Sequence, residues 1–147
     1  MRDRLRLWRE LLGKAGKTLN ETRQELIRSE RGRKELAAKK EMLVKMKADY
    51  SESLRSFSTT EDPARKVSVT LNFIKHLEQT ITVISEQLEE MNKEQAFLKR
   101  RHNDDFRELK KFESLEARTR VALERAEEMR ENKDRDLQIL SRLSRKS

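Results

Sequence analysis

The chain has 147 residues, of which 42% are charged and 34% hydrophobic, with three Gly and one Pro. This balance is too polar for a thick globular core and is typical of a long helix or coiled coil. The lack of Cys excludes a disulfide framework and a thiolate site. No apolar run approaches the roughly 18 residues that span a bilayer, and the N-terminal residues lack the apolar core of a signal peptide. We therefore expect a soluble cytoplasmic protein.

The formal net charge of +8 is concentrated at both ends of the chain. Residues 1–34 carry 11 Lys and Arg against 5 Asp and Glu, and residues 118–147 carry 9 against 6. If the chain doubles back on itself, both basic segments lie at the same end of the molecule. An electrostatic role is then expected of the paired termini.

The first half of the chain has one heptad frame, which begins at Leu5. Row a holds Leu5, Leu12, Leu19, Leu26, Arg33, Lys40, Lys47 and Leu54, and row d holds Trp8, Ala15, Thr22, Ser29, Leu36, Leu43, Tyr50 and Phe57. Ile27, Ala37 and Val44 widen the apolar stripe on one flank. Each Gly in a helix interior costs roughly 1 kcal/mol relative to Ala, and Gly13 and Gly16 lie close together. The frame predicts a helix over about residues 3–57 that is weaker near its N-terminal end.

Helix-breaking signals coincide only in residues 58–63, which read STTEDP. The residue before a proline is disfavoured in the α region, and Asp62 as N-cap with Pro63 at the first helical position suits a helix start. A turn over about residues 58–62 is therefore predicted. A single kinked helix is the alternative, but it would leave both apolar rows in need of other chains, so an antiparallel hairpin is preferred.

The second half of the chain has the longer frame. Row a holds Val67, Ile74, Ile81, Leu88, Gln95, His102, Leu109, Glu116, Leu123, Arg130 and Leu137, and row d holds Thr70, Leu77, Ile84, Met91, Leu98, Asp105, Phe112, Thr119, Ala126, Lys133 and Leu140. Apolar residues at a and d between charged neighbours indicate a coiled-coil helix, here over about residues 63–140. At about 1.5 Å per residue, such a helix is on the order of 110 Å long.

The predicted fold is all-α, a long antiparallel two-helix coiled-coil hairpin that forms a single domain over residues 1–147, with the second helix longer than the first. A turn near residue 60 places Leu43 near Leu77, Leu36 near Ile84, and Trp8 near Phe112. Residues from about 118 onward then have no partner in the chain. Because their apolar rows continue, this C-terminal overhang is expected to bind another protein.

The sequence offers little for catalysis or cofactor binding. Residues 13–18 (GKAGKT) end like a phosphate-binding loop, but Leu11 stands where that motif needs a glycine, and no strand precedes it. His76 and His102 are far apart in the sequence, which disfavours a shared metal site. We expect a solvated flank position for His76 and a partly hydrated position in the interhelical seam for His102. A thin coiled coil has no pocket in which to raise the pKa of a carboxyl group. We therefore predict no enzyme activity, cofactor, metal or small-molecule substrate.

Residues 43–54 (LVKMKADYSESL) and 72–81 (NFIKHLEQTI) resemble the FliJ/YscO family of bacterial type III export proteins. The resemblance lies in a Tyr followed four residues later by Leu, and in an Asn-Phe-Ile-x-x-Leu-Glu-x-x-Ile block about twenty residues further on. It covers in detail roughly a quarter of the chain, and total length and hairpin order agree. Met46, Thr80 and Ile84 stand where the flagellar pattern has an aromatic, an Ala and a His, which favours an injectisome (YscO-like) member over a flagellar one.

The resemblance implies a specific function. Proteins of this family are antiparallel coiled coils similar to the central stalk of rotary ATPases, so this chain would couple ATP hydrolysis to export from the cytoplasm, at the base of the apparatus beside the inner membrane. Their paired termini enter the hexameric ring of the secretion ATPase, which would involve Arg2, Arg4, Arg6, Trp8, Leu123, Arg130, Leu137 and Leu140. The other end contacts the cytoplasmic domain of the export-gate membrane protein, which would involve Leu43, Met46, Tyr50, Phe73 and Leu77. Some members also handle substrate chaperones.

Two other interpretations stay open. One is a nucleic-acid-binding coiled coil that uses its basic termini, although the few aromatic residues give little support to stacking on bases. For residues 99–101 (KRR) a solvated helix face is preferred to a nucleic-acid patch. The other is a scaffold in which two chains pair in parallel.

Overall fold

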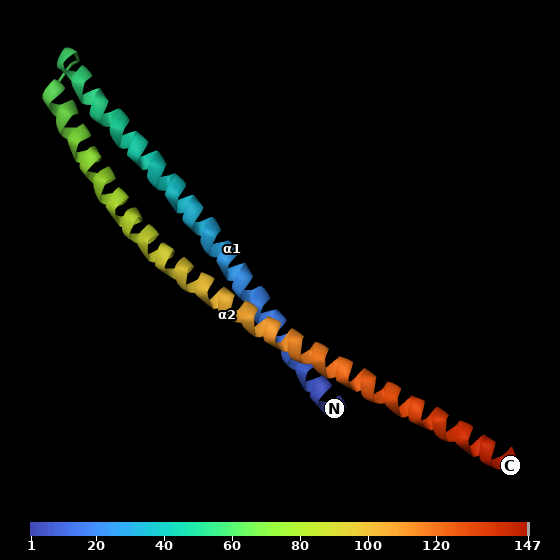
Figure 1. Ribbon diagram of the computed structural model, residues 1–147. Helices are drawn as coiled ribbons and strands as arrows, with labels where there is room; N and C mark the ends of the chain where they lie inside the picture. Colours follow the sequence, from blue (N-terminus) through green and yellow to red (C-terminus); the bar gives the residue numbers. More distant parts are fainter. Residues whose placement is uncertain (147) are drawn as a thin grey trace. The chain divides into compact units, whose positions relative to one another are not determined.

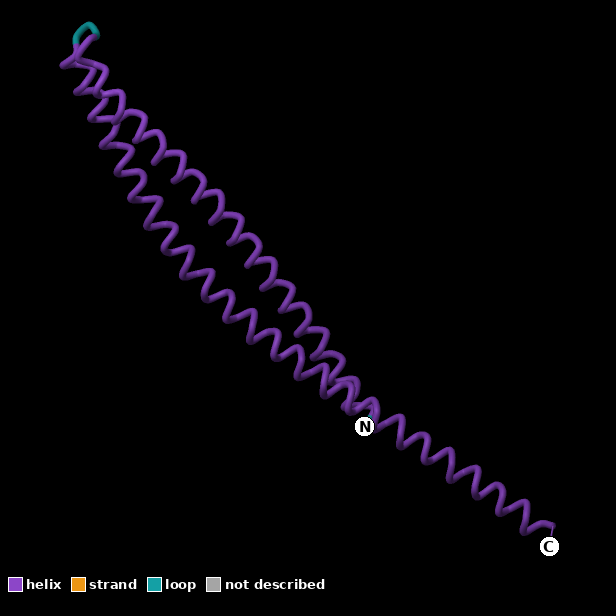
Figure 2. Tube along the Cα trace, turned by 45° about the horizontal axis from the view of Figure 1, so that its top comes forward, coloured by secondary structure: helices purple, strands orange, loops and turns teal. Residues whose placement is uncertain are grey.

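The computed structural model describes residues 1–146 (Figure 1). Helix α1 (Arg2–Ser53) is followed by the short 3-10 helix η1 (Leu54–Thr59) and by helix α2 (Pro63–Lys146), which is the longer helix. No strand occurs in this part of the chain. The fold is the predicted all-α antiparallel two-helix hairpin, in which the chain reverses between η1 and α2 (Figure 2).

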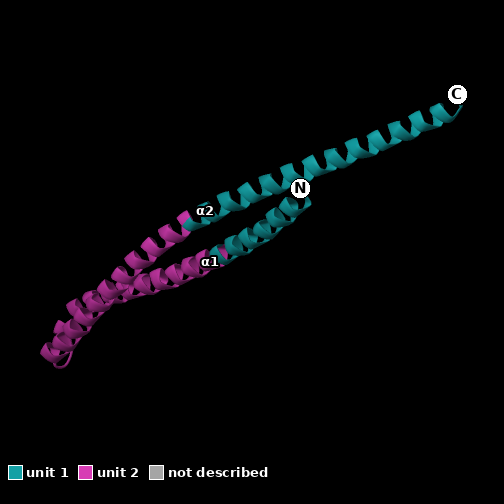
Figure 3. Cartoon of the chain, turned by 90° about the horizontal axis from the view of Figure 1, so that it is seen from below, with its two compact units in different colours: residues 1–22, 101–147 teal, residues 23–100 magenta. Residues whose placement is uncertain are grey.

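The hairpin divides into two compact units, and each contains a stretch of both helices (Figure 3). Unit 1 comprises residues 1–22 and 101–147, and unit 2 comprises residues 23–100. Within each unit the two helical stretches lie side by side and antiparallel (Figures 1 and 2). Each unit therefore has its own part of the interhelical seam.

Burial follows the predicted heptad rows closely. In α2, every residue of rows a and d from Val67 to Ala126 is buried or half-buried, and Leu77 and Ile84 are each only 4% exposed. In α1, the residues of rows a and d are likewise buried or half-buried, with the exception of Tyr50, and this includes the charged row-a residues Arg33, Lys40 and Lys47. Their aliphatic stems cover apolar surface while the charged ends reach water. The heptad assignment of both helices is confirmed.

A polar layer interrupts the apolar seam of unit 1. Thr22 is the most buried side chain, at 1% exposure, and its hydroxyl lies 2.6 Å from Asp105 Oδ2 and 3.1 Å from the carbonyl oxygen of Thr18. The hydroxyl donates to one of these acceptors at a time. A shift of one helix along the other would separate the half-buried Asp105 carboxylate from the Thr22 hydroxyl, whereas Thr22 could still donate to Thr18, so it is the loss of the Asp105 partner that favours a single register.

A second polar layer lies in the seam of unit 2. Gln95, which is 8% exposed, donates a hydrogen bond from its amide to the Glu30 carboxylate. The same carboxylate accepts hydrogen bonds from Arg33, with Nη2 at 2.9 Å and Nε at 3.3 Å. These bonds, first that from Arg33 and then that from Gln95, lower the pKa of Glu30 from 4.5 to about 2. Glu30 therefore stays ionised while it binds the buried amide across the seam.

Helix α1 ends earlier than the sequence suggested. The expected first helix ran to about Phe57, but α1 ends at Ser53 and the chain continues as η1. Hydroxyl groups explain the change, because Ser56 and Thr59 donate to the carbonyl oxygens of Ser53 and Ser56, at 2.8 and 3.1 Å. Such local bonds compete with the α-helical pattern. Asp62 then adopts φ of 50°, which Asp tolerates, directly before α2 begins.

The register differs in part from the expected one. Trp8 does stack on Phe112, with ring centroids 6.2 Å apart. Other contacts reach between about one and two and a half helical turns further along α2 than expected. Lys47 pairs with Glu78 at 3.3 Å, and Arg2 pairs with Glu127 at 3.2 Å. Packing in unit 1 thus continues to Glu127, and the C-terminal overhang begins near residue 128 rather than 118. A reversal nearer to Asp62 than to residue 60 accounts for about four residues of this difference.

Replacing Gly13 by Ala should raise the free energy of unfolding by about 0.5–1 kcal/mol, because Gly costs this much in a helix interior. A Cβ atom at Gly13 would meet no atom within 4 Å. Urea unfolding followed by circular dichroism measures the change. Gly32→Ala is the comparison, because a Cβ there would lie 3.1 Å from Met91 Cε and the gain should be smaller. A Gly13→Ala variant no more stable than the parent would contradict a continuous α1.

Acid should weaken unit 2 through Glu30. Because the folded-state pKa is the lower one, ionised Glu30 stabilises the fold fully above about pH 4.5, and this contribution is lost as the pH falls toward 2. Thermal unfolding of the parent and of Glu30→Gln should therefore show an advantage of the parent near pH 6 that shrinks near pH 3. An equal difference at both pH values would mean that the carboxylate does not link folding to pH.

Candidate functional site

The residues predicted to bind the export gate fall into an accessible part and a buried part. Tyr50 and Phe73 meet edge to face, with ring centroids 4.8 Å apart and an interplanar angle of 65°. Both residues remain about two-fifths exposed, at 39% and 38%. Leu77 is 4% exposed, and Leu43 and Met46 are half-buried. The aromatic pair is thus the accessible part, and Leu77 belongs to the core of the seam.

Sequence reasoning missed other exposed apolar side chains in unit 2. Val69 and Leu71, close to the start of α2, are 61% and 50% exposed, and Val83 is 51% exposed. They lie outside rows a and d, where a heptad analysis gives them no partner. The only signal in the sequence was the presence of apolar residues at positions that a two-helix seam leaves open to water.

The residues expected at the paired termini lie together in unit 1. Ion pairs join the two helices there, from Arg2 to Glu127 at 3.2 Å and from Arg9 to Glu116 at 3.3 Å. Arg4 and Arg6 are exposed, and Trp8 is half-buried through its stacking on Phe112. Surface ion pairs of this kind add little stability. Their cations remain accessible, since the Arg2 side chain is 82% exposed.

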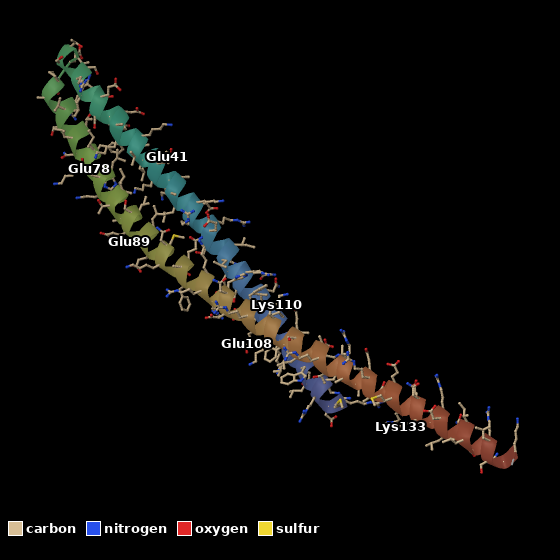
Figure 4. All side chains as sticks on the ribbon, viewed as in Figure 1. Glu41, Glu78, Glu89, Glu108, Lys110 and Lys133 are labelled. Atoms are coloured by element: carbon tan, nitrogen blue, oxygen red, sulfur yellow. The ribbon has the colours of Figure 1, made fainter. Side chains whose placement is uncertain are left out.

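The overhang of α2 exposes a series of apolar side chains. From Glu128 to Lys146 every residue is exposed (Figure 4). The expected contact residues Leu137 and Leu140 are 63% and 62% exposed, and Arg130 lies one heptad before Leu137 in the same row. Leu123, by contrast, is half-buried where α1 still covers α2. Three further side chains of this segment are exposed but were not among the predicted contact residues, namely Met129, Ile139 and Leu143.

The structure bears on the other motifs as well. Residues 13–18 (GKAGKT) lie inside α1, so their backbone N–H groups are committed to helical hydrogen bonds and cannot form a phosphate-binding loop. Across residues 1–146, no group of three or more His, Cys, Asp and Glu side chains could hold a metal ion. The described helices also include none that is long and apolar enough to cross a membrane.

Comparison with known proteins identifies the family. The family model described as "Flagellar FliJ protein" matches residues 9–146, which is nearly the whole chain. Searches of curated proteins and of solved structures give no match. The matched range contains both heptad frames, the turn and the overhang. The chain therefore belongs to the FliJ family of stalk proteins associated with type III protein export.

Proposed function

We propose that this protein is the non-enzymatic central stalk of a type III export apparatus, which couples hydrolysis in the ATPase ring to the export gate. The family supports an association with components of the export apparatus. The observation that carries the proposal is the overhang of α2, where exposed leucines continue the heptad rows beyond the last interhelical ion pair. Such a stripe needs a partner outside the hairpin.

The ATPase ring is proposed to bind the paired termini and the overhang. This surface combines the exposed cations Arg2, Arg4 and Arg6 with the apolar pair Leu137 and Leu140. An apolar core with a charged rim is the usual arrangement of a protein interface. Different faces of the stalk would contact successive ring subunits, so that stalk position and hydrolysis state are linked.

The export gate is proposed to bind the exposed aromatic pair of Tyr50 and Phe73. Aromatic side chains provide a large contact area and are enriched among the residues that dominate binding energy. Leu43 and Met46 are half-buried and would contribute a smaller contact area, while Leu77 is part of the core between the helices. The YscO-like assignment rests on Met46, Thr80 and Ile84 and stays a prediction. So do the binding of substrate chaperones and a location in the cytoplasm beside the inner membrane.

Removal of residues 128–147 should abolish binding to the secretion ATPase while the hairpin still folds, because packing between the helices ends at Glu127. Surface plasmon resonance with the ATPase measures binding, and circular dichroism measures folding. In the full chain, Leu137→Ser with Leu140→Ser should weaken binding, whereas Ile139→Ser, off the two heptad rows, is the control. Unchanged ATPase affinity of the shortened chain would refute this part of the proposal.

Phe73→Ala should weaken binding to the cytoplasmic domain of the gate protein by roughly ten-fold or more, because it removes half of the exposed aromatic pair. Isothermal titration calorimetry measures the affinity. The helicity and the melting temperature should change little. Leu77→Ala is the contrasting variant, since loss of a buried Leu should cost about 2–5 kcal/mol of stability. If Phe73→Ala destabilises the fold as strongly as Leu77→Ala does, Phe73 is a core residue.

A further inference from the structure

Unit 2 carries a groove along one flank of α1, beside the polar layer of Glu30 and Gln95. The groove has a volume of about 920 Å³, and its lining includes Leu26, Ile27, Arg31 and Lys34 from α1 and Gln95 and Lys99 from α2. Leu26 is half-buried and Gln95 is buried, so they form the floor. Ile27 stands at the edge and is 60% exposed.

This flank is distinct from both surfaces that the proposed function uses. In the heptad frames, Glu30 and Lys99 occupy e positions and Ile27 occupies a b position, whereas Met46 and Phe73 occupy g positions. The e and g positions lie on opposite sides of an a/d seam. All these residues belong to unit 2, whereas the paired termini and the overhang belong to unit 1. A ligand of the groove therefore need not compete with the ATPase ring or the gate.

Apolar side chains continue along the same flank of α1. Ala37 and Val44 occupy e positions that follow Glu30 at heptad spacing, and Val44 is 46% exposed. Ala37 is half-buried, and both residues lie about a quarter of a turn around α1 from Ile27, so they extend the apolar flank without forming one row with Ile27. Exposed apolar side chains on the flank of a helix are a surface against which another helix can pack.

The charge of the groove is positive. Arg31, Arg33, Lys34 and Lys99 line it, against the carboxylates of Glu30 and Glu35. Glu30 is already neutralised by Arg33 at 2.9 Å, with Lys34 Nζ 3.9 Å away. Arg31 and Lys99 are exposed, and neither forms an ion pair within residues 1–146. With four cations against two carboxylates, the lining has a net charge of +2, and Arg31 and Lys99 lie at its rim without an ion pair in the described part of the chain.

We propose that this groove is a docking site for an acidic amphipathic helix of another protein. Apolar side chains of that helix would lie on Ile27 and Leu26, and its carboxylates would reach Arg31, Lys34 and Lys99. Ile27, Arg31 and Lys34 are spaced i, i+4 and i+7, so the contact covers about two helical turns. Charge complementarity selects an acidic helix over a neutral or basic one.

The probe is a fluorescently labelled helical peptide of about 18 residues, with Leu at i, i+4, i+7 and i+11 and Glu on both sides of that stripe. Fluorescence anisotropy with the full chain near 0.15 M salt should show saturable binding. Ile27→Glu should weaken it by roughly ten-fold or more, through loss of the apolar contact and repulsion of the peptide. Binding of the ATPase and of the gate domain should be unchanged in this variant.

Val83→Glu is the matched control, because Val83 is also β-branched, is 51% exposed and lies in unit 2 outside the groove. It adds the same charge and should leave peptide binding unchanged. Circular dichroism checks that both variants fold. Lys99→Gln against Lys75→Gln repeats the comparison without touching an apolar residue, and only Lys99→Gln should weaken binding.

Several results would overturn the proposal. The interaction would depend on net charge alone if Ile27→Glu and Val83→Glu weakened peptide binding equally. The same conclusion would follow if a peptide of the same composition, with its leucines in scrambled positions, bound equally well. Displacement of the peptide by a single-stranded oligonucleotide would assign the groove to nucleic acid. A dimer in sedimentation that Ile27→Glu dissociates would assign it to a second copy of this chain. Absence of saturable binding would leave the groove without this function.

Discussion

Burial of rows a and d of α1 against those of α2 is the constraint on which the other features depend. Helices of this length in water are stabilised by packing of an apolar face more than by intrinsic propensity. The two polar layers limit how that face packs, because the Asp105 carboxylate meets the Thr22 hydroxyl, and the buried Gln95 amide meets Glu30, only in this alignment. Moving either helix would separate both pairs and leave the Asp105 carboxylate and the Gln95 amide without these partners, which costs free energy.

Beyond the residues of α2 that pack on α1, the apolar side chains of rows a and d are exposed and available to another protein. Up to Glu127 the apolar rows of α2 are covered by α1 within unit 1, and from Glu128 onward every described residue is exposed. The heptad pattern does not change at this point. Leu123 and Leu137 occupy the same row, yet one is half-buried and the other is 63% exposed. The presence or absence of α1 alone makes the difference, and the proposed ATPase contact depends on it.

The packing of rows a and d between the two helices also determines which apolar residues remain exposed on the flanks of the hairpin. Rows a and d are used internally, so apolar residues at b, c, e and g stay exposed to water. Phe73 on one flank and Ile27 on the other are examples, at 38% and 60% exposure. The first is the centre of the proposed gate contact and the second of the proposed groove for an acidic helix. Two separate partners could thus use one hairpin without disturbing its core.

The exposure of the predicted site residues could not be derived from the sequence. Tyr50 and Leu77 both lie in row d, and the family resemblance assigned them the same role. Tyr50 is 39% exposed near the end of α1, whereas Leu77 is 4% exposed in α2. No local pattern separates them, because exposure at a seam position depends on how closely the facing helix approaches there. The groove beside Glu30 was likewise not predicted, since its lining residues come from both helices.

The sequence by itself determined the helical period, the two heptad rows of each helix, the reversal before Pro63 and the family. These are local properties, since a spacing of 3.6 residues per turn and the chemistry of Asp62 and Pro63 act within a few residues. Only the tertiary structure decided the register, the end of pairing at Glu127 and the exposure of each site residue. A heptad frame looks the same after a shift of seven residues, so the alignment of the helices depends on which layers meet across the seam. That choice is made by Thr22 with Asp105 and by Glu30 with Gln95, pairs separated by 83 and 65 residues along the chain.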